Sequence, residues 1–407
     1  MSDPESQRER APRVLVLLGN AALNGQERGN IEALYAAKSV GVDALFVTHA
    51  DWGHVQIQPT LDRLGLRWTS LAYAYHFTKR LRPLGWVKNL TRLVKASWGL
   101  GRIARRYEPT HIHAANQHYV LSVLPALLLM RTPLIYRLGD VPTQHHALYR
   151  FVWRWLVVPR VERFVCISEH IRESLIATGA PPYKAHVLYS YPPERPVPEH
   201  PVTLDPFDGR TVAYVGQIRP HKGVDILVEA ALALCRERDD VRFVLAGSVS
   251  KQNPFALVLA GKVQAAGLAD RIRFVGYLED VPGLLVGADV HTCPSVCDEA
   301  LGNVVLEAKQ AGVPSVVFPD GGLPELVEHG LDGFVCRAKT AAALREGIEY
   351  YLDVDVATLG AAKEAAGVSL ARRGITRPAF AQAWGSVYGI APPDKQREHA
   401  SAAEGAA

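Results

Sequence analysis

Long hydrophobic runs are missing from this chain of 407 residues. Its longest apolar stretch, Tyr119 to Met130, spans twelve residues and contains Pro125, which makes it too short to cross a bilayer. The first ten residues also lack the apolar core of a secretory signal. We therefore expect a cytoplasmic protein.

Cysteine is scarce, and the five residues form no compact framework, which favours a reducing compartment. Cys293 and Cys297 form a lone C-x3-C without a second pair of ligands nearby. We interpret them as small buried side chains and predict neither a metal site nor a cofactor. No G-x-G-x-x-G motif follows either leading strand, which argues against a nicotinamide dehydrogenase.

Net charge is low, at +4, but it is unevenly placed. Residues 1–200 hold 25 Lys and Arg against 15 Asp and Glu, which gives +10. Residues 201–407 hold 20 against 26, which gives −6. A basic half joined to an acidic half suggests that one domain meets an anionic surface or ligand.

The length exceeds what one hydrophobic core usually supports, so two domains are expected. Short apolar, β-branched runs alternate with longer helical patterns, which is typical of βαβ units and parallel sheets. Residues 191–208 are rich in proline, which lacks the amide proton that a central strand needs, so they are interpreted as a linker. The sequence predicts an α/β protein with two Rossmann-like, doubly wound domains that face a cleft.

The first domain is predicted at residues 13–195, and the second domain at 210–375, with the linker between them at 196–209. A C-terminal helix at 376–391 is expected to cross back to the first domain. Disordered tails are predicted at 1–12 and 392–407. Strands are predicted at 14–18, 42–48, 111–114, 134–136, 164–167, 211–215, 241–246, 271–275, 289–292, 314–318 and 334–336. Helices are predicted at 30–40, 224–236, 254–266, 303–311, 323–329 and 340–352. Ligands bind such sheets at the carboxyl ends of the strands.

A loop with two glycines and two cations follows the strand that ends at Val215. Gly216 and Gly223 allow the backbone to approach a ligand, and Arg219 and Lys222 place positive charge beside a helix N-terminus. This combination suits a diphosphate. A surface loop with two solvated cations is the alternative.

Two carboxylates, Glu299 and Glu307, stand eight residues apart near the start of a predicted helix. This spacing rotates by about 80° around a helix axis, so both can point into one cleft. Carboxylates accept hydrogen bonds from vicinal hydroxyls, and Glu307 lies among apolar residues where it needs donors. A capping or salt-bridged role is the alternative. Gly247 and the turn Gly321–Glu325 each follow a strand, but each alone could be only a tight turn.

Together the stretches GQIRPHKG, PSVCDEALGNVVLEA and GGLPE resemble the retaining glycosyltransferases of the GT-B fold, specifically glycosyltransferase family 4. The resemblance is strong over residues 211–336. It implies a nucleoside-diphosphate-sugar donor of the UDP or GDP type, a hydroxyl of a glycan or lipid-linked acceptor and no metal. It also implies that the departing phosphate, rather than a protein base, deprotonates the acceptor.

The resemblance implies roles for particular positions. Lys222 holds the donor diphosphate, Glu307 the ribose hydroxyls and Glu299, as a catalytic residue, contacts the transferred sugar. The full set of implied donor-binding residues is Gly216, Gln217, Arg219, Lys222, Gly247, Leu301, Gly302, Asn303 and Glu307.

The sequence departs from the family pattern at three places. Gln217 stands where the family commonly has arginine, so Arg219 is the candidate to replace it. Ala300-Leu301 replaces Gly-Phe. Asp353-Val-Asp355 matches the D-x-D of a different glycosyltransferase fold, but it follows a C-terminal helix and is interpreted as a chance match.

The first half carries a partial match to the family turn between donor phosphate and acceptor, at Gly25-Gln-Glu-Arg28. His113, His118 and Asp140 follow predicted strands that should face the cleft. Asp140 is the candidate to orient the acceptor hydroxyl, and a loop aspartate that caps the next helix is the alternative.

Residues 79–106 hold nine Lys and Arg and no acidic residue, interleaved with leucine and tryptophan. This pattern is typical of an interfacial helix, and we favour contact with an anionic membrane surface. One alternative is a solvated basic face. The other is a nucleic-acid site, which the same charges would also suit, but we do not expect nucleic acid as a partner. Residues 151–156 form a second candidate patch, for which a core helix is the safer interpretation.

Two other functions are compatible with these patterns. A nucleotide-sugar epimerase shares the fold and would consume donor without an acceptor. A non-enzymatic basic scaffold could bind RNA or anionic lipid.

Overall fold

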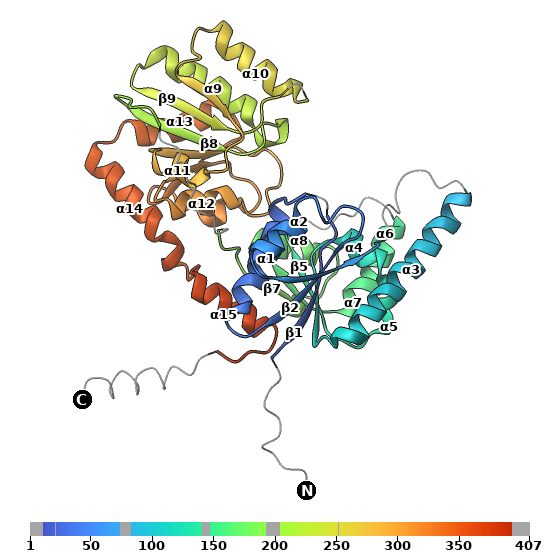
Figure 1. Cartoon of the computed structure of the whole chain (residues 1–407). Helices are drawn as coiled ribbons and strands as arrows, with labels where there is room; N and C mark the ends of the chain where they lie inside the picture. Colours follow the sequence, from blue (N-terminus) through green and yellow to red (C-terminus); the bar gives the residue numbers. More distant parts are fainter. Residues whose placement is uncertain are drawn as a thin grey trace, which may run out of the picture. The chain divides into compact units, whose positions relative to one another are not determined.

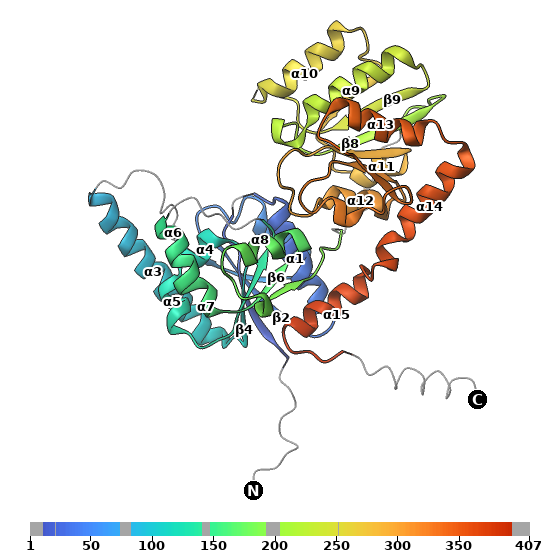
Figure 2. The same cartoon turned by 180° about the vertical axis from the view of Figure 1, so that it is seen from behind.

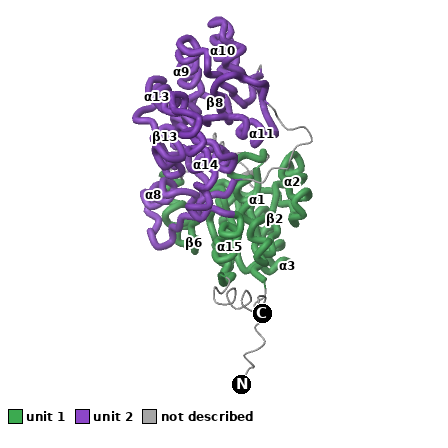
Figure 3. Tube along the Cα trace, turned by 90° about the vertical axis from the view of Figure 1, so that its left-hand side faces the viewer, with its two compact units in different colours: residues 1–137, 144–165, 377–407 green, residues 138–143, 166–376 purple. Residues whose placement is uncertain are grey.

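The computed structural model describes residues 11–20, 22–73, 83–140, 147–192, 204–250 and 252–392, with the backbone alone for 83–89. Two compact units divide the chain (Figure 3). Unit 1 comprises residues 1–137, 144–165 and 377–407, and unit 2 comprises residues 138–143 and 166–376. Most of the predicted tails, most of the predicted linker and the basic residues at 79–82 lie outside the described residues.

The first sheet contains seven strands in the described residues, in the order β3-β2-β1-β4-β5-β6-β7 (Figure 1). These strands are β1 (Arg13–Leu17), β2 (Asp43–His49), β3 (Arg67–Leu71), β4 (His111–Ala114), β5 (Leu134–Leu138), β6 (Val161–Cys166) and β7 (Ala185–Val187). β1 pairs in parallel with both β2 and β4. Val14 to Leu17 are fully buried, as expected for a parallel strand covered on both faces.

Helices cover both sides of this sheet: α1 (Gly25–Lys38), α2 (Ile57–Arg63), α3 (Pro83–Tyr107), α4 (Gln117–Ser122), α5 (Leu124–Leu129), α6 (Ala147–Val152), a π-helical turn at Trp153–Val157, α7 (Val158–Arg160), α8 (Glu169–Ala177) and α15 (Arg377–Val387). α3 packs on α5, and α6 and α7 contact the π-helical turn between them, whereas α15 packs on α1 (Figures 1 and 2). The last helix of the chain therefore belongs to unit 1.

The second sheet has six parallel strands in the described residues, in the order β10-β9-β8-β11-β12-β13. These strands are β8 (Arg210–Val215), β9 (Val241–Ala246), β10 (Ile272–Gly276), β11 (Val290–Cys293), β12 (Ser315–Val317) and β13 (Gly333–Val335). The helices are α9 (Val224–Glu237), α10 (Pro254–Ala265), α11 (Val281–Val286), α12 (Asn303–Gln310), α13 (Ala341–Leu352) and α14 (Val356–Arg372).

Side chains alternate between the two faces of this sheet. Val212 and Tyr214 pack with α9, α10 and α13, while Ala213 packs with α11 and α12. The strand period of two thus builds a core on each face. The α/β fold with two parallel sheets confirms the predicted fold class.

The structure differs from the expected elements at several places. The helix predicted at 323–329 is only a 3-10 turn, Pro324–Leu326, because Val327 returns to extended backbone. α1 begins five residues before the predicted start, since Asn24 caps it through bonds from the amides of Gln26 and Glu27. α14 was not expected, because its many alanine and glycine residues give little apolar periodicity.

The compact units also differ from the expected boundary at residues 138–140 and 166–192, which group with unit 2 although β7 pairs within the first sheet. Hydrogen bonds from the first turn of α8 to Glu325 account for part of this grouping. Among the helices of the described segments, none has both the length and the apolar content to span a bilayer.

Candidate functional site

The loop after β8 is shaped by a glycine that no other residue can replace. Gly223 has φ +64°, and a Cβ there would lie 1.9 Å from the carbonyl oxygen of Pro294. The same loop accepts hydrogen bonds at the His221 carbonyl from the amides of Val296 (3.1 Å) and Cys297 (3.3 Å). The ends of β8 and β11 are therefore joined through their backbones.

Lys222 and Glu299 meet at this junction. The Lys222 ammonium donates to Glu299 Oε2 at 2.5 Å, and both side chains are about three-quarters buried. Burial opposes the charged ammonium, but the Glu299 carboxylate outweighs it, and the pKa of Lys222 is raised above its ordinary value. Two residues 77 positions apart, each singled out in the sequence, thus form one charged pair at the carboxyl edge of the sheet.

A glycine turn holds the backbone of Glu299 in place. The amide of Gly322 donates to the Glu299 carbonyl at 2.7 Å. A Cβ at Gly321 would lie 2.2 Å from the same carbonyl oxygen. The turn therefore serves as a support for the Glu299 loop.

Two helices start from this edge with a glycine as N-cap. Gly223 precedes α9, Gly302 precedes α12, and neither helix has a side-chain cap. Uncapped amides and the helix dipole favour an anion at such an end. The site thus combines the Lys222 cation with two helix N-termini that lack a side-chain cap.

α12 places Asn303 at its first position and Glu307 four residues later, on the same face. Glu307 is 9 % exposed. Leu301 is 1 % exposed, so its side chain belongs to the core and only its backbone can meet a ligand. A Cβ at Gly247 would lie 2.2 Å from the Gly216 carbonyl, which shows how closely the ends of β8 and β9 approach.

The two remaining donor candidates lie on the rim of the loop. The side chains of Gln217 and Arg219 are exposed, while the Gln217 carbonyl accepts a bond from the Tyr214 hydroxyl at 2.9 Å. Arg219 is the N-cap of the 3-10 turn Pro220–Lys222. Its side chain is therefore open to a ligand, whereas Gln217 is fixed mainly through its backbone.

The acceptor candidates of unit 1 gather at the carboxyl ends of β1 and β4. Gly25 and Arg28 form the first turn of α1 rather than a preceding loop, and His118 lies exposed in the first turn of α4. The side chain of Gln26 links the two loops through the Ala115 carbonyl and Asn116.

Asp140, the remaining candidate, is exposed after β5 and is grouped with unit 2. The next residues of the chain lie outside the described part.

Two family models match this chain and between them reach both sheets. Glycosyltransferase Family 4 matches residues 23–190, and Glycosyl transferases group 1 matches residues 199–366. The chain belongs to glycosyltransferase family 4. The resemblance seen in the sequence is thereby confirmed.

Individual curated relatives share less than a third of their aligned residues with this chain. A D-inositol 3-phosphate glycosyltransferase of Mycolicibacterium gilvum is 28 % identical over 302 residues, which cover 67 % of this chain and 66 % of that protein. The lipopolysaccharide core biosynthesis mannosyltransferase LpcC of Rhizobium leguminosarum bv. viciae is 26 % identical over 301 residues, covering 73 % and 81 %. The chain spans no more than about two thirds of the length of the first curated relatives that it matches.

Solved structures share the fold. The crystal structure of Alr3699/HepE of Anabaena in complex with UDP has a TM-score of 0.73 at 20 % identity and covers 92 % of this chain and 99 % of that one. At this identity the likeness concerns the architecture.

In this family 4 chain His113 does not face a cleft, contrary to expectation. It is completely buried, with Nδ1 2.7 Å from the Tyr388 hydroxyl and Nε2 3.0 Å from Asn30 Oδ1. Burial lowers the pKa of His113 to about 3. The residue is thus a neutral core histidine that joins β4, α1 and the end of α15.

Sequence reasoning missed the role of Glu325. Its carboxylate accepts bonds from the amides of Glu169 (2.8 Å) and His170 (2.7 Å) and from the Tyr189 hydroxyl (2.9 Å). Nearby, the Ser168 hydroxyl donates to the Ala300 carbonyl at 2.5 Å. The glycine turn therefore caps α8 at the side of the Glu299 loop, a role for which the sequence carries no local signal.

The cysteine and D-x-D motifs have local structural roles. Cys293 is buried, which raises its pKa to about 12, whereas Cys297 is only half-buried, contrary to expectation. Asp353 pairs with Arg238, and Asp355 caps α14 by accepting from the Thr358 amide at 2.7 Å. Within the described residues no group of three or more His, Cys, Asp or Glu is arranged to hold a metal ion.

Proposed function

We propose that this chain transfers a sugar from a nucleoside-diphosphate-sugar to a hydroxyl of a glycan or lipid-linked acceptor, with retention of configuration and without a metal. The observation that carries the proposal is the Lys222–Glu299 pair, set beside the uncapped N-termini of α9 and α12. Family membership supports a transferase, and HepE, which shares the fold, was crystallised with UDP. The proposal concerns the whole reaction, including donor and acceptor.

The donor diphosphate would lie at the two helix ends, with its charge balanced by Lys222 and Arg219. Glu307 would accept hydrogen bonds from the ribose hydroxyls. Glu299 would contact the transferred sugar, because its carboxylate is already fixed next to the diphosphate site by Lys222. These groups stabilise a leaving group that gains negative charge as the bond breaks.

Chemistry would then proceed on one face of the sugar. The bond between the anomeric carbon and the β-phosphate oxygen breaks, and the acceptor oxygen forms the new glycosidic bond from the same side. The acceptor proton passes to the departing phosphate. His118, Asp140 and the Gly25–Arg28 turn are the residues proposed to orient the acceptor.

The decisive experiment is a transfer and hydrolysis screen over UDP- and GDP-sugars. We expect Lys222→Met and Glu307→Gln to lower donor turnover at least about 100-fold, since each removes a charged contact to the donor. Matched controls are Lys262→Met and Glu229→Gln, which change exposed residues of α10 and α9. Activity of the wild type should persist in EDTA.

Three outcomes would contradict this proposal. Full turnover in both site variants would remove the site assignment. Conversion of the donor to its epimer without an acceptor would identify an epimerase. Failure of every nucleoside diphosphate to bind in calorimetry would favour a scaffold.

We also propose that α3 contacts an anionic membrane at the cytoplasmic face, where a lipid-linked acceptor would lie. Leu90, Val94 and Trp98 recur every fourth residue and are each about 60 % exposed. Arg92 and Lys95 stand exposed between them. An apolar stripe flanked by cations fits a bilayer interface.

A second exposed stripe supports this proposal. Leu148, Phe151 and Trp155 are exposed on α6 and the π-helical turn, while Trp153 and Val157 of the same segment are buried. Residues 151–156, for which a core helix was the safer interpretation, therefore have one buried apolar side and one exposed apolar side.

A further inference from the structure

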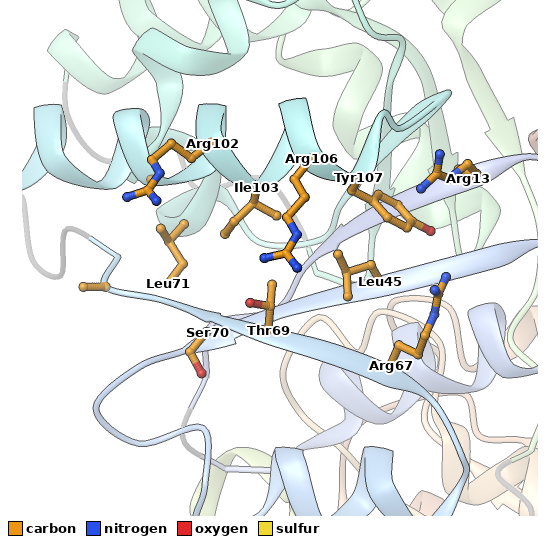
Figure 4. Close-up of a pocket in the computed structure, with 12 residues that line it drawn as sticks. Arg13, Leu45, Arg67, Thr69, Ser70, Leu71, Arg102, Ile103, Arg106 and Tyr107 are labelled. Atoms are coloured by element: carbon orange, nitrogen blue, oxygen red, sulfur yellow. The ribbon is translucent and has the colours of Figure 1, made fainter.

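A second basic site lies in unit 1, between α3 and the edge strand β3 (Figure 4). It is a groove of about 600 Å³. None of the residues proposed above for the donor or the acceptor lines it. Its ligand is therefore a separate question from the transfer reaction.

Four arginines line this groove: Arg13, Arg67, Arg102 and Arg106. Arg102 and Arg106 are four residues apart and lie on the same face of α3. Figure 4 shows their guanidinium groups pointing from α3 towards β3, while that of Arg67 points from β3 back towards the helix. The cations thus face one another across the groove.

Only part of this charge is neutralised. Arg67 bonds to Asp43, and Arg13 lies 3.8 Å from Glu108, which is largely exposed. Within the described residues, Arg102 and Arg106 have no carboxylate partner, and Arg102 lies 4.8 Å above the Trp98 ring. Like charges at this spacing repel each other, so an anion between them would be stabilising.

The rest of the groove suits an anion attached to a larger body. Thr69 and Leu71 lie on the face of β3 that is turned towards α3 (Figure 4). Ser70 points to the opposite face, where its hydroxyl accepts a hydrogen bond from the Gln58 side-chain amide at 3.3 Å. Leu45 and Ile103 add apolar surface. Guanidinium groups bind phosphate through paired hydrogen bonds. A carboxylate offers the same paired geometry but only one negative charge, whereas the groove holds several cations, so a phosphate is the better match.

We propose that this groove binds the phosphate group of a phosphorylated ligand. Arg102 and Arg106 hold the phosphate oxygens, Thr69 donates its hydroxyl, and the apolar wall carries the remainder of the ligand. A free phosphate ester and a lipid headgroup offer the same chemistry. The proposal does not depend on the proposed transferase reaction.

Inorganic pyrophosphate is the probe, titrated calorimetrically into the full chain at low salt. Every protein carries Lys222→Met, so that the donor site contributes little. We expect Arg102→Gln/Arg106→Gln to weaken binding at least about tenfold, as the loss of charge-assisted bonds requires. Arg92→Gln/Arg105→Gln removes the same charge from exposed positions of α3 outside the groove and should change the affinity less than about twofold.

Vesicles of phosphatidylcholine with and without phosphatidylglycerol distinguish a lipid headgroup from a free phosphate ester as the ligand of the groove. A lipid headgroup is indicated if the groove variant loses vesicle binding more than its control does, and if vesicles compete with pyrophosphate. A free phosphate ester is indicated if pyrophosphate binding alone depends on the groove. Equal behaviour of groove variant and control towards both probes would overturn the proposal.

A measurement on unsubstituted protein guards against misfolded variants. Phenylglyoxal modifies accessible arginines, and mass spectrometry reports each site. Pyrophosphate should protect Arg102 and Arg106 several-fold while leaving Arg105 reactive. Equal modification of all three with and without pyrophosphate would also overturn the proposal.

Discussion

A buried charged cluster supports the helix that carries Glu307. Lys309 Nζ lies 2.5 Å from Asp332 Oδ2, and the two residues are 0 and 1 % exposed. Ser369 donates to the same carboxylate oxygen at 2.5 Å and accepts from Lys309 at 3.2 Å. Burial lowers the pKa of Lys309 to about 8, which remains high enough for the ammonium form at neutral pH. The cluster joins α12, α14 and the turn before β13.

Lys309→Met should lower the free energy of unfolding of unit 2 by about 3–5 kcal/mol, because it leaves a buried Asp332 charge without its partner. Lys309→Met/Asp332→Asn should recover most of this loss, since the charge is removed as well. Urea unfolding followed by far-ultraviolet circular dichroism measures both. Lys363→Met, which affects a more exposed pair with Asp289, is the control. A double variant no more stable than the single one would show that packing, not charge, sets the cost.

The residues of the donor site differ in how far sequence could place them. Lys222 and Glu299 each follow a predicted strand, and parallel strands gather such ends on one edge, so their proximity was predictable. Glu325 and Lys309 bind partners that are distant in sequence or lie on packed helices. Neither contact leaves a local pattern, because tertiary packing alone decides it.

At the scale of elements, α3 shows why exposure was harder to predict than helicity. Ala96, Leu100 and Ala104 form its buried face, and Leu90, Val94 and Trp98 form a second apolar face open to solvent. The helical period is visible in the sequence, but two apolar stripes fit it equally well. Which stripe packs on the sheet depends on the neighbouring elements.

The exposed stripe of α3 allows a direct test of membrane contact. Leu90→Ser/Trp98→Ser should reduce binding to phosphatidylcholine–phosphatidylglycerol vesicles at least about tenfold, because insertion of each side chain contributes roughly 1.5–3 kcal/mol. Co-sedimentation at 0.1 M salt (roughly a 10 Å screening length) measures it. Leu257→Ser/Val258→Ser, on the exposed side of α10, is the matched control.

Unchanged sedimentation of the α3 variant would refute the contact. The pyrophosphate affinity of the groove should stay the same in Leu90→Ser/Val94→Ser, because neither side chain lines the groove and, unlike Trp98, neither stacks with Arg102. The two proposals for α3 can therefore fail separately.

At the scale of the whole molecule, two histidines of the described residues are 0 % exposed, one in each unit. His113 lies in unit 1 and His291 in unit 2, where its Nδ1 is 3.0 Å from Ser315 Oγ. Burial lowers the pKa of each from 6.5 to about 3. Between these values the unfolded chain binds more protons than the folded one, so both units lose stability as pH falls below 6.5.

From pH 7 to pH 5 each histidine should cost its unit about 2 kcal/mol of unfolding free energy. All seven tryptophans belong to unit 1, so tryptophan fluorescence during urea unfolding reports that unit alone. His113→Gln should therefore flatten the pH dependence of the fluorescence transition, although it also lowers stability at pH 7. His54→Gln, at an exposed position, should leave the slope unchanged.

Because His291 is remote from every tryptophan-bearing segment in sequence and belongs to the other unit, His291→Gln should flatten only the transition seen by hydrogen exchange in β11 and β12. An unaltered fluorescence slope in His113→Gln would mean that other groups set the acid sensitivity of unit 1.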